Sequence, residues 1–171
     1  GDEKGAVDEN FRRFCDRLHM DWRKIVSTDQ THTANVRIVT EADEGHGISR
    51  PKSFFDIDGQ VTDVPGLPLI TYHADCVPLF FVDPVKKAIG LTHSGWRGTA
   101  ARIGRNTVET MQKAYGSRPE DIIAVIGPSV CQNCYEVSED VARAFMEGFR
   151  ISDRLVYAKG GGKYQLNLWE A

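Results

Sequence analysis

The apolar positions of this chain fall into short runs that are separated by polar and glycine-rich stretches. Two such runs, at residues 69–72 and 77–82, are followed after a turn at Asp83-Pro84 by a third run at residues 88–91. The three runs are nearly continuous in valine, isoleucine, leucine and phenylalanine, which predicts strands that are covered on both faces. We therefore expect the middle of the chain to form the centre of a sheet.

Helices are predicted where apolar residues recur at every third or fourth position. This pattern covers residues 8–20, 98–115 and 138–148, and the first of these segments carries one apolar stripe. Residues 122–126 are predicted to form a buried strand, and a hairpin is predicted across the three glycines at 160–162. The alternation of strands and helices predicts an α/β (α+β) fold.

The length and composition are those of one ordinary globular domain over residues 1–171. The net charge of −3 provides no global field to hold nucleic acid or an anionic membrane. No apolar run approaches the roughly 20 residues that span a bilayer, and the acidic start of the chain is unlike a signal peptide. Four cysteines at this density indicate a reducing, cytoplasmic setting. Residues 167–171 resemble the start of a helix at which the chain stops, which suggests a truncated sequence.

Ligand-type residues stand at the ends of the central apolar runs. Asp75 and Cys76 precede the second run, and His93 follows the third, so the side chains of Cys76 and His93 can converge across one turn. His32 lies in a polar segment between two predicted strands. One thiolate and two imidazoles are zinc-type ligands, and three protein ligands leave a fourth position open for water or substrate. Asp75 is placed to support a ligand or to carry protons.

Spacing alone leaves two alternatives to a metal site. In the first, Cys76 and one of the two histidines, His93 or His32, form a thiolate–imidazole pair for covalent catalysis. In the second, all of these residues are structural. The pattern favours neither a metal nor a nucleophile decisively at this point.

Two arginines are candidates for binding an anion. Arg97 lies at a predicted strand-to-helix junction, where backbone N–H groups and the charged guanidinium favour an anion, although it could instead pair with a surface carboxylate. Arg50 lies in the long polar loop at residues 40–60 and could hold a carboxylate or a phosphate. His46, in the same loop, is flanked by glycines and is interpreted as a mobile surface histidine.

Cys131 and Cys134 form a C-x-x-C motif. A redox dithiol or half of a zinc knuckle would use this spacing, but the chain has no second C-x-x-C to complete four ligands. We therefore assign no role to this motif from the sequence.

Five segments together resemble one known family. The chain closely resembles the YfiH family, also called the laccase-domain or multicopper polyphenol oxidase-like family, over nearly its whole length. The segments that carry the resemblance are DQTHTANV at 29–36, TEADEGHGI at 40–48, DGQVTDVPGLPLITYHADCVPLFFVDP at 58–84, AIGLTHSGWRGTAARI at 88–103 and IGPSVCQNCYEV at 126–137.

The resemblance implies an α/β (α+β) fold with mixed β-sheets sandwiched by helices, a metal site and an activity. It makes His32, Cys76 and His93 the metal triad of a zinc-dependent purine nucleoside enzyme of the phosphorylase type. The reactions it implies are phosphorolysis of adenosine, inosine and methylthioadenosine, and deamination of adenosine. The implied partners are a small nucleoside and phosphate, with no nucleic acid and no membrane. Arg97 as a phosphate or ribose contact, and Asp75 as a proton carrier, are our hypotheses for these reactions.

The resemblance also brings alternatives with it. The family was named for copper-dependent phenol oxidation, but multicopper chemistry needs many histidines, and this chain has five. The fold implied by the resemblance is similar to that of a toxin deamidase with a Cys–His pair, so a metal-free cysteine hydrolase is a further alternative. A non-catalytic metal-binding module is the simplest one.

The chain departs from the family pattern in two places. The family often has Gly-Pro-Cys-Cys where this chain has Cys131-Gln-Asn-Cys134, so only Cys134 matches a family cysteine. His73 replaces a residue that is usually not histidine, and it is either an extra ligand or part of the pocket lining. The chain also begins and ends inside the family pattern, so we expect segments at both ends to be absent. The preferred nucleoside, the native metal and the oligomeric state are left open.

Overall fold

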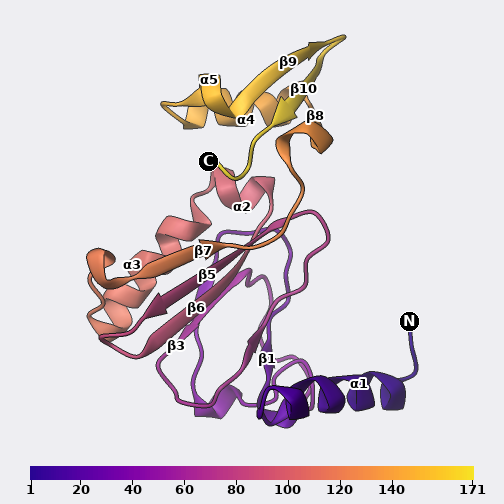
Figure 1. Ribbon diagram of the computed structural model, residues 1–171, viewed down its shortest axis with the longest axis vertical. Helices are drawn as coiled ribbons and strands as arrows, with labels where there is room; N and C mark the ends of the chain where they lie inside the picture. The colour runs from indigo at the N-terminus through magenta and orange to yellow at the C-terminus, as the bar shows by residue number, and fades with distance from the viewer.

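The structure of the protein is a computed structural model that describes residues 1–171. It contains a five-stranded sheet with one long helix on its face, and a smaller three-stranded sheet with two helices at the C-terminal end (Figure 1). The helices are α1 (Lys4–Arg17), α2 (Trp96–Ala100), α3 (Ile103–Tyr115), α4 (Glu139–Gly148) and α5 (Ser152–Leu155). The strands are β1 (Val26–Ser27), β2 (Val36–Ile38), β3 (Gly59–Thr62), β4 (Leu69–Ile70), β5 (Val77–Asp83), β6 (Ala88–Ser94), β7 (Ile123–Ile126), β8 (Glu136–Ser138), β9 (Val156–Gly160) and β10 (Lys163–Leu166).

The five-stranded sheet has the order β2-β3-β6-β5-β7. Strands β2 and β3 pair in parallel, and the other neighbours pair antiparallel, so the sheet is mixed as predicted. The predicted turn at Asp83-Pro84 joins β5 to β6. The Asp83 side chain accepts hydrogen bonds of 2.9 Å from the backbone N–H groups of Val85 and Lys86, which fixes this turn. The register of the hairpin places Val77 opposite Ser94 and therefore brings the start of β5 to the end of β6.

Helix α3 covers one face of this sheet. Its buried positions Ile103, Thr107 and Met111 recur at every fourth residue, and Met111 packs against Phe81 in the sheet core. The prediction of one helix over residues 98–115 was wrong in one respect. Arg102 has a left-handed φ of 64°, which ends α2 and redirects the chain into α3.

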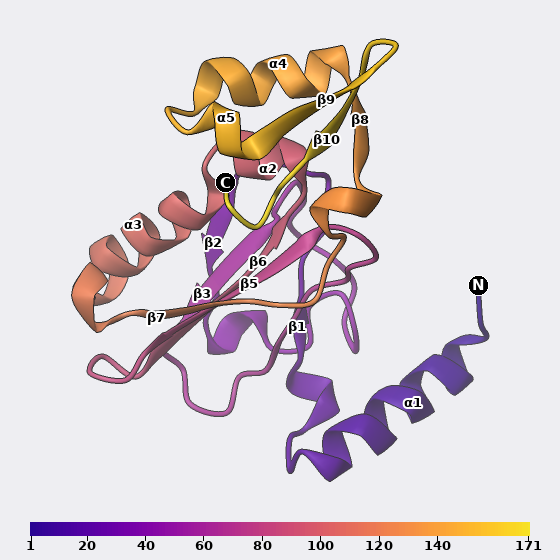
Figure 2. The same ribbon diagram turned by 45° about the horizontal axis from the view of Figure 1, so that its top comes forward.

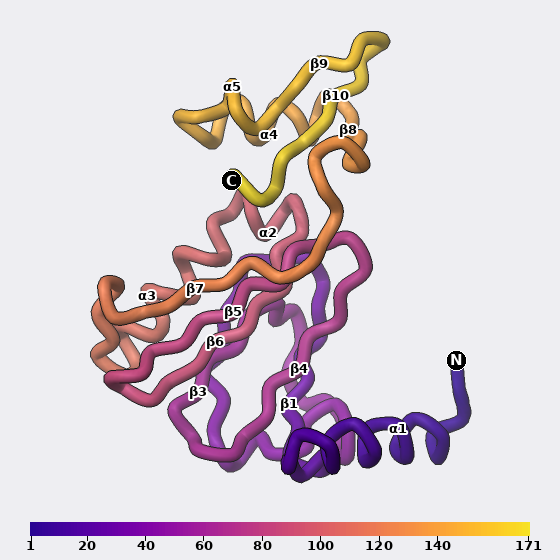
Figure 3. The backbone as a smooth tube through the Cα atoms, viewed as in Figure 1, coloured from indigo at the N-terminus to yellow at the C-terminus, as the bar shows by residue number.

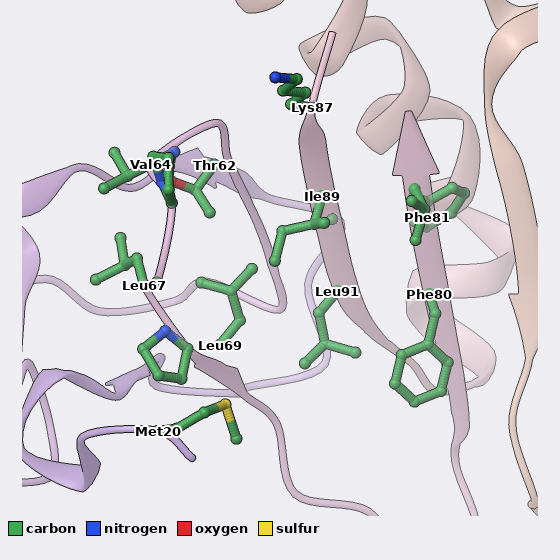
Figure 4. A pocket seen from close by; sticks show the side chains of 15 residues that line it. Met20, Thr62, Val64, Leu67, Leu69, Phe80, Phe81, Lys87, Ile89 and Leu91 are labelled. Carbon is green, nitrogen blue, oxygen red and sulfur yellow. Dashed lines mark hydrogen bonds between the residues drawn. The ribbon is translucent and has the colours of Figure 1, made fainter. Parts of the chain in front are cut away.

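The opposite face of the sheet is exposed at β5, β7 and the start of β6, which corrects the prediction that the central strands are covered on both faces. Phe80, Val82 and Ile89 are 43%, 42% and 39% exposed, and every residue of β7 is exposed rather than buried. Towards β3 the same face is covered, because the fully buried Gln60 donates hydrogen bonds of 3.2 Å and 2.9 Å to the carbonyls of Val26 and Ile70 in the β1–β4 pair. A hollow of about 510 Å³ lies on this face, with apolar side chains that include Leu69 and Leu91 around its walls (Figure 4).

The C-terminal layer consists of a sheet with the order β8-β10-β9 and helices α4 and α5 (Figure 2). Its core contains Phe145 and Leu166, and this core continues onto Val77 at the start of β5 and Trp96 of α2. The predicted hairpin across residues 160–162 is confirmed, and so is the helix that was predicted at 138–148. Residues 167–171 form no helix.

Helix α1 lies at the edge of the molecule and extends away from the sheet (Figure 3). The helix was predicted over residues 8–20; it begins earlier, at Lys4, and also ends earlier, at Arg17. Of its residues only Cys15 is buried. Phe14 is 63% exposed and Leu18, which follows the helix, is 50% exposed, so the apolar stripe has no partner layer. Neither α1 nor any other helix combines the length and the apolar character that are needed to cross a membrane.

Candidate metal and active site

Three ligand-type side chains from distant segments meet at one edge of the five-stranded sheet. His32 comes from the loop between β1 and β2, Cys76 directly precedes β5, and His93 lies near the end of β6. Their ligand atoms all lie within 4.8 Å of one another. The pairing of Val77 with Ser94 explains the approach of Cys76 to His93. The structure therefore brings together the three residues that the sequence predicted as metal ligands.

The three ligands differ in their exposure to solvent. His93 is buried, Cys76 is half-buried, and His32 is exposed, with its ring 4.9 Å from the ring of His93 in an edge-on arrangement. A metal at this position would be held from the protein side by Cys76 and His93. The side nearest His32 would be open to a small molecule.

The buried carboxylate of Asp58 holds two of the three ligand segments in place through hydrogen bonds. It lies directly before β3 and accepts hydrogen bonds from the backbone N–H groups of Thr31 (3.2 Å), His32 (3.1 Å) and Thr33 (2.6 Å). It also accepts a bond of 2.8 Å from the Thr33 hydroxyl and one of 2.8 Å from Nδ1 of His93. One side chain therefore fixes the loop that carries one ligand and the ring of another.

Asp58 also explains the backbone conformation of His32. His32 has a φ of 65°, a left-handed conformation that is uncommon outside glycine and asparagine. Such strained residues persist only where their surroundings hold them, and they cluster at functional sites. Three consecutive N–H groups bound to one carboxylate are that restraint here.

The hydrogen bond between Asp58 and His93 fixes the proton positions of the pair. Burial opposes the ionisation of Asp58, but hydrogen bonds from His93 and Thr33 outweigh it and lower the pKa of Asp58. An ionised carboxylate only accepts, so Nδ1 of His93 donates to it and Nε2 faces the other ligands. Burial also opposes protonation of His93, but hydrogen bonds to Asp58 and Cys76 outweigh it and raise the pKa of His93 to about 9.

Sequence reasoning did not identify Asp58 and treated it as part of a long polar loop. The signal that would have found it is an acidic residue directly before a buried strand. Asp58 is fully buried, and the following strand β3 pairs with β6, which carries His93. A buried acid needs partners, and the nearest available donors are the ligand loop and the ligand ring.

Gly95 allows the three ligands to approach one another. A Cβ atom at this position would lie 2.9 Å from Cδ2 of His32 and 3.0 Å from Sγ of Cys76. Carbon and sulfur do not approach this closely without displacement. The absence of a side chain at Gly95 is therefore a requirement for the geometry of the triad.

His73 lies beside the triad but does not belong to it. Its ring is 5.2 Å from that of His93, and its nitrogens lie 2.9 Å from the Thr71 hydroxyl and 3.2 Å from the carbonyl of Cys76. Burial lowers the pKa of His73. Because both nitrogens are engaged, the structure supports a pocket-lining position over a fourth ligand.

The other side chains near the site come from two further segments. Asp75 is exposed, and Arg97 is exposed with its guanidinium 4.3 Å from the ring of Trp96. The half-buried Tyr135 lies within electrostatic reach of Asp75, Cys76 and Arg97, and burial with the first two raises the pKa of its hydroxyl. Tyr135 was not singled out from the sequence. The roles of Asp75 and Arg97 stay predictions.

Two residues of the 40–60 loop are placed away from this chemistry. The guanidinium of Arg50 donates 3.0 Å hydrogen bonds to the carbonyls of Ala42 and Glu44, so it supports its own loop, and a role in binding substrate stays a prediction. The interpretation of His46 as a mobile surface residue was wrong. His46 is 3% exposed, and its ring stacks on Phe54 at 3.5 Å.

The donor set of the triad matches zinc. A thiolate and two imidazoles are suited to a borderline-soft dication, and three protein ligands leave one position open. A carboxylate on Nδ1 of His93 leaves Nε2 as the nitrogen directed toward a metal, which would displace the Nε2 proton on binding. The set is much smaller than the histidine-rich ligand sets of multicopper sites.

Known proteins of one family are similar to this chain along nearly its whole length. A family profile described as "Multi-copper polyphenol oxidoreductase laccase" matches residues 1–171. The purine nucleoside phosphorylase YlmD of Bacillus subtilis is 38% identical over 170 residues, which are 99% of this chain and 61% of that protein. Adenosine deaminase RL5, from an unknown prokaryotic organism, is 33% identical over 98% of this chain and 64% of its own length. A crystal structure of the hypothetical protein YfiH from Bacillus licheniformis superposes with a TM-score of 0.93 at 36% identity, over 99% of this chain and 64% of that chain. The chain thus spans less than two thirds of the length of these relatives.

Proposed function

The chain belongs to the family described as multi-copper polyphenol oxidoreductase laccase, and within that family we propose that it acts as a zinc-dependent purine nucleoside enzyme. The observation that carries this proposal is the convergence of His32, Cys76 and His93 within 4.8 Å of one another, supported from below by Asp58. Relatives named purine nucleoside phosphorylase and adenosine deaminase support the same substrate class.

In this proposal the three converging side chains hold the zinc ion. When bound, zinc supplies a Lewis acid that polarises a water molecule or a substrate oxygen. Asp58 keeps the proton of His93 on Nδ1, so that Nε2 stays available as a ligand. The exposed position of His32 leaves the approach for a nucleoside on its side of the site.

The two reactions assign different work to the neighbouring residues. In phosphorolysis, Arg97 would bind phosphate, which attacks C1′ of the ribose while the purine leaves with the bonding electrons. In deamination, Asp75 would carry a proton from the attacking water to the amino group that leaves C6. Both residues are exposed: Asp75 directly precedes Cys76, and Arg97 lies in α2, which follows β6 and His93.

The proposal extends to the partners and the cellular compartment. The partners would be a nucleoside and inorganic phosphate, and the net charge of −3 gives no attraction for nucleic acid or an anionic membrane. All four cysteines are free, which favours a reducing compartment such as the cytoplasm.

The test combines metal analysis with turnover. We expect about one zinc per chain in the purified protein and release of adenine from adenosine that depends on phosphate, or of inosine without phosphate. Cys76→Ala should lose both zinc and turnover while circular dichroism stays unchanged. The exposed Cys134→Ala is the matched control and should keep both. An unchanged rate in Cys76→Ala would refute the proposal.

One observation favours a second candidate, a metal-free cysteine hydrolase. Asp58 is hydrogen-bonded to His93, and the ligand atoms of His93 and Cys76 lie within 4.8 Å of each other. Acid, imidazole and thiol thus follow one another in the order used to activate a cysteine nucleophile. Turnover that survives metal removal and is abolished by thiol alkylation would select this candidate. Oxygen consumption with phenols by copper-loaded protein would instead select the oxidase, and metal binding without any turnover a binding module.

A further inference from the structure

The C-x-x-C segment forms a tight turn that the proposed activity does not use. Gln132–Cys134 is a 3-10 helix, and Cys131 is its N-terminal capping residue. The backbone N–H of Cys134 donates a 3.0 Å hydrogen bond to the carbonyl of Cys131, which closes the turn. Cys131 itself is extended, with a ψ of 160°, so it is this i→i+3 hydrogen bond that keeps the two cysteines close together.

The dimensions of this turn suit a disulfide. Three steps of about 2.0 Å rise place the two Cα atoms roughly 6 Å apart. Disulfides span Cα separations of about 4.4–6.8 Å. A bond between the two sulfur atoms can therefore form with little movement of the backbone.

The two thiols differ in pKa and in exposure to solvent, as the attacking and the resolving thiol of a disulfide exchange do. Cys131 is half-buried, and hydrogen bonds from the Cys134 thiol and backbone N–H lower its pKa. Cys134 is exposed, and the hydrogen bond with Cys131 raises its pKa. Cys131 is therefore the better nucleophile and Cys134 the accessible resolving thiol. Cys15, by contrast, is 1% exposed in the core.

The turn joins the two parts of the fold beside the candidate site. The backbone N–H of Val130 donates a 3.0 Å hydrogen bond to the carbonyl of Asp75, next to the ligand Cys76. On the other side, the side chain of Gln165 on β10 donates a 2.9 Å bond to the carbonyl of Asn133. The turn is thus held from both ends, which keeps the two cysteines in the same relative position.

We propose that Cys131 and Cys134 form a reversible dithiol–disulfide pair that exchanges with small disulfides of the glutathione class. The Cys131 thiolate attacks one sulfur of the oxidised disulfide and releases one small thiolate. The Cys134 thiolate then attacks the mixed disulfide at Cys131 and releases the second small thiolate. The protein loses two electrons and two protons, the small disulfide gains them, and two small thiols are formed.

The pair is independent of the proposed nucleoside activity, and it is tested by its covalent state. The chain is equilibrated in buffers of reduced and oxidised glutathione, quenched in acid, alkylated and analysed by peptide mass spectrometry. We expect an internal Cys131–Cys134 disulfide that is two hydrogens lighter than the dithiol, is reversed by reduced glutathione, and leaves Cys15 unmodified.

Two variants make the result specific. Cys134→Ser should trap glutathione on Cys131 as a stable mixed disulfide, because no resolving thiol remains. Cys131→Ser should react more slowly than Cys134→Ser, because the backbone N–H groups of Asn133 and Cys134 lower the pKa of Cys131 in the second variant and do not act on Cys134 in the first. Circular dichroism verifies that both variants fold.

Three outcomes would overturn the proposal. One is persistent glutathionylation of the native chain without internal disulfide. Another is equal reactivity of the two single variants. The third is a second zinc per chain that shields both thiols from alkylation until a chelator removes it, which would make the turn a metal site.

Discussion

The buried carboxylate of Asp58 provides the sharpest test of how this site is built. Asp58→Asn keeps the size and shape of the side chain but replaces one accepting oxygen with an N–H donor group. In the native chain both oxygens only accept: one from His32 N–H and His93, the other from Thr31 N–H, Thr33 N–H and the Thr33 hydroxyl. In either orientation of the amide, its NH₂ group therefore points at two or more groups that themselves donate hydrogen bonds.

The better orientation places the new donor toward His93 and the His32 N–H. The imidazole of His93 must then accept at Nδ1 and carry its proton on Nε2, which removes its lone pair from the metal position. In this orientation the His32 N–H loses its acceptor, which costs about 1–3 kcal/mol, and the charge-assisted hydrogen bond to His93 becomes a neutral one, which costs about 1–2 kcal/mol more. We therefore expect a loss of about 2–5 kcal/mol in the free energy of unfolding. Loss of a carboxylate behind a ligating histidine should weaken zinc binding about 10- to 100-fold.

The assay separates these two effects. Urea unfolding with a chelator present gives the stability of the metal-free chain, and competition with a chromophoric chelator gives zinc affinity. Asp56→Asn is the matched control, because Asp56 is exposed, lies two residues away, and uses one oxygen to accept from the Thr31 hydroxyl. Its φ of 56° also suits asparagine. If Asp58→Asn matched this control in both measurements, the supporting role assigned to Asp58 would be refuted.

Further predictions concern the packing and the titration of the site and its support. Gly95→Ala should weaken zinc binding at least about tenfold, because its Cβ would lie 2.9 Å and 3.0 Å from two ligand side chains. The control Gly5→Ala, where the new atom meets nothing within 4 Å, should leave zinc affinity unchanged. Equal zinc affinities of the two variants would contradict the packing argument. His46→Ala should lower the free energy of unfolding by about 2–4 kcal/mol, because the buried ring stacks at 3.5 Å and is hydrogen-bonded at both nitrogens, and a change below about 0.5 kcal/mol in urea unfolding would show that the ring is not structural. The metal-free chain should be less stable at high pH, since the pKa of His93 is raised from 6.5 to about 9: the stabilisation is complete below pH 6.5 and is lost as the pH rises through 9. Urea unfolding of chelator-treated protein between these pH values measures it, and a flat profile would contradict the ion pair with the carboxylate.

The sequence predicted the central hairpin and the approach of Cys76 to His93 because both depend on local signals. Apolar runs with a turn at Asp83-Pro84 predict β5 and β6, and the position of Cys76 before one strand and His93 after the other follows from antiparallel pairing. The fold class, the C-terminal hairpin and α4 were predicted on the same grounds. Placing His32 in this site needed the resemblance, because a histidine in a polar loop has no periodicity to locate it.

The parts that the sequence did not predict depend on contacts between distant segments. His46 was read as mobile because glycines flank it, but Ser27 and Phe54 enclose its ring in the fold. Asp58 became a supporting residue only because the loop at 31–33 folds over it. The apolar stripe of α1 and the exposed face of the sheet show the converse, since an amphipathic pattern identifies an apolar surface without identifying what covers it.

The dispersion of the three ligands along the chain has a consequence for biosynthesis. His32 and His93 are separated by roughly 60 residues, and closing a loop of this length costs about 4 kcal/mol of chain entropy. A nascent chain cannot assemble the site until β6 has been synthesised and has paired with both β3 and β5. Metal acquisition would therefore come late in folding. An ion held at the triad would act as a cross-link between segments that lie far apart in the sequence. Chains that misfold around the sheet would retain no tightly bound metal, so metal content would report the fraction of the protein that has folded correctly.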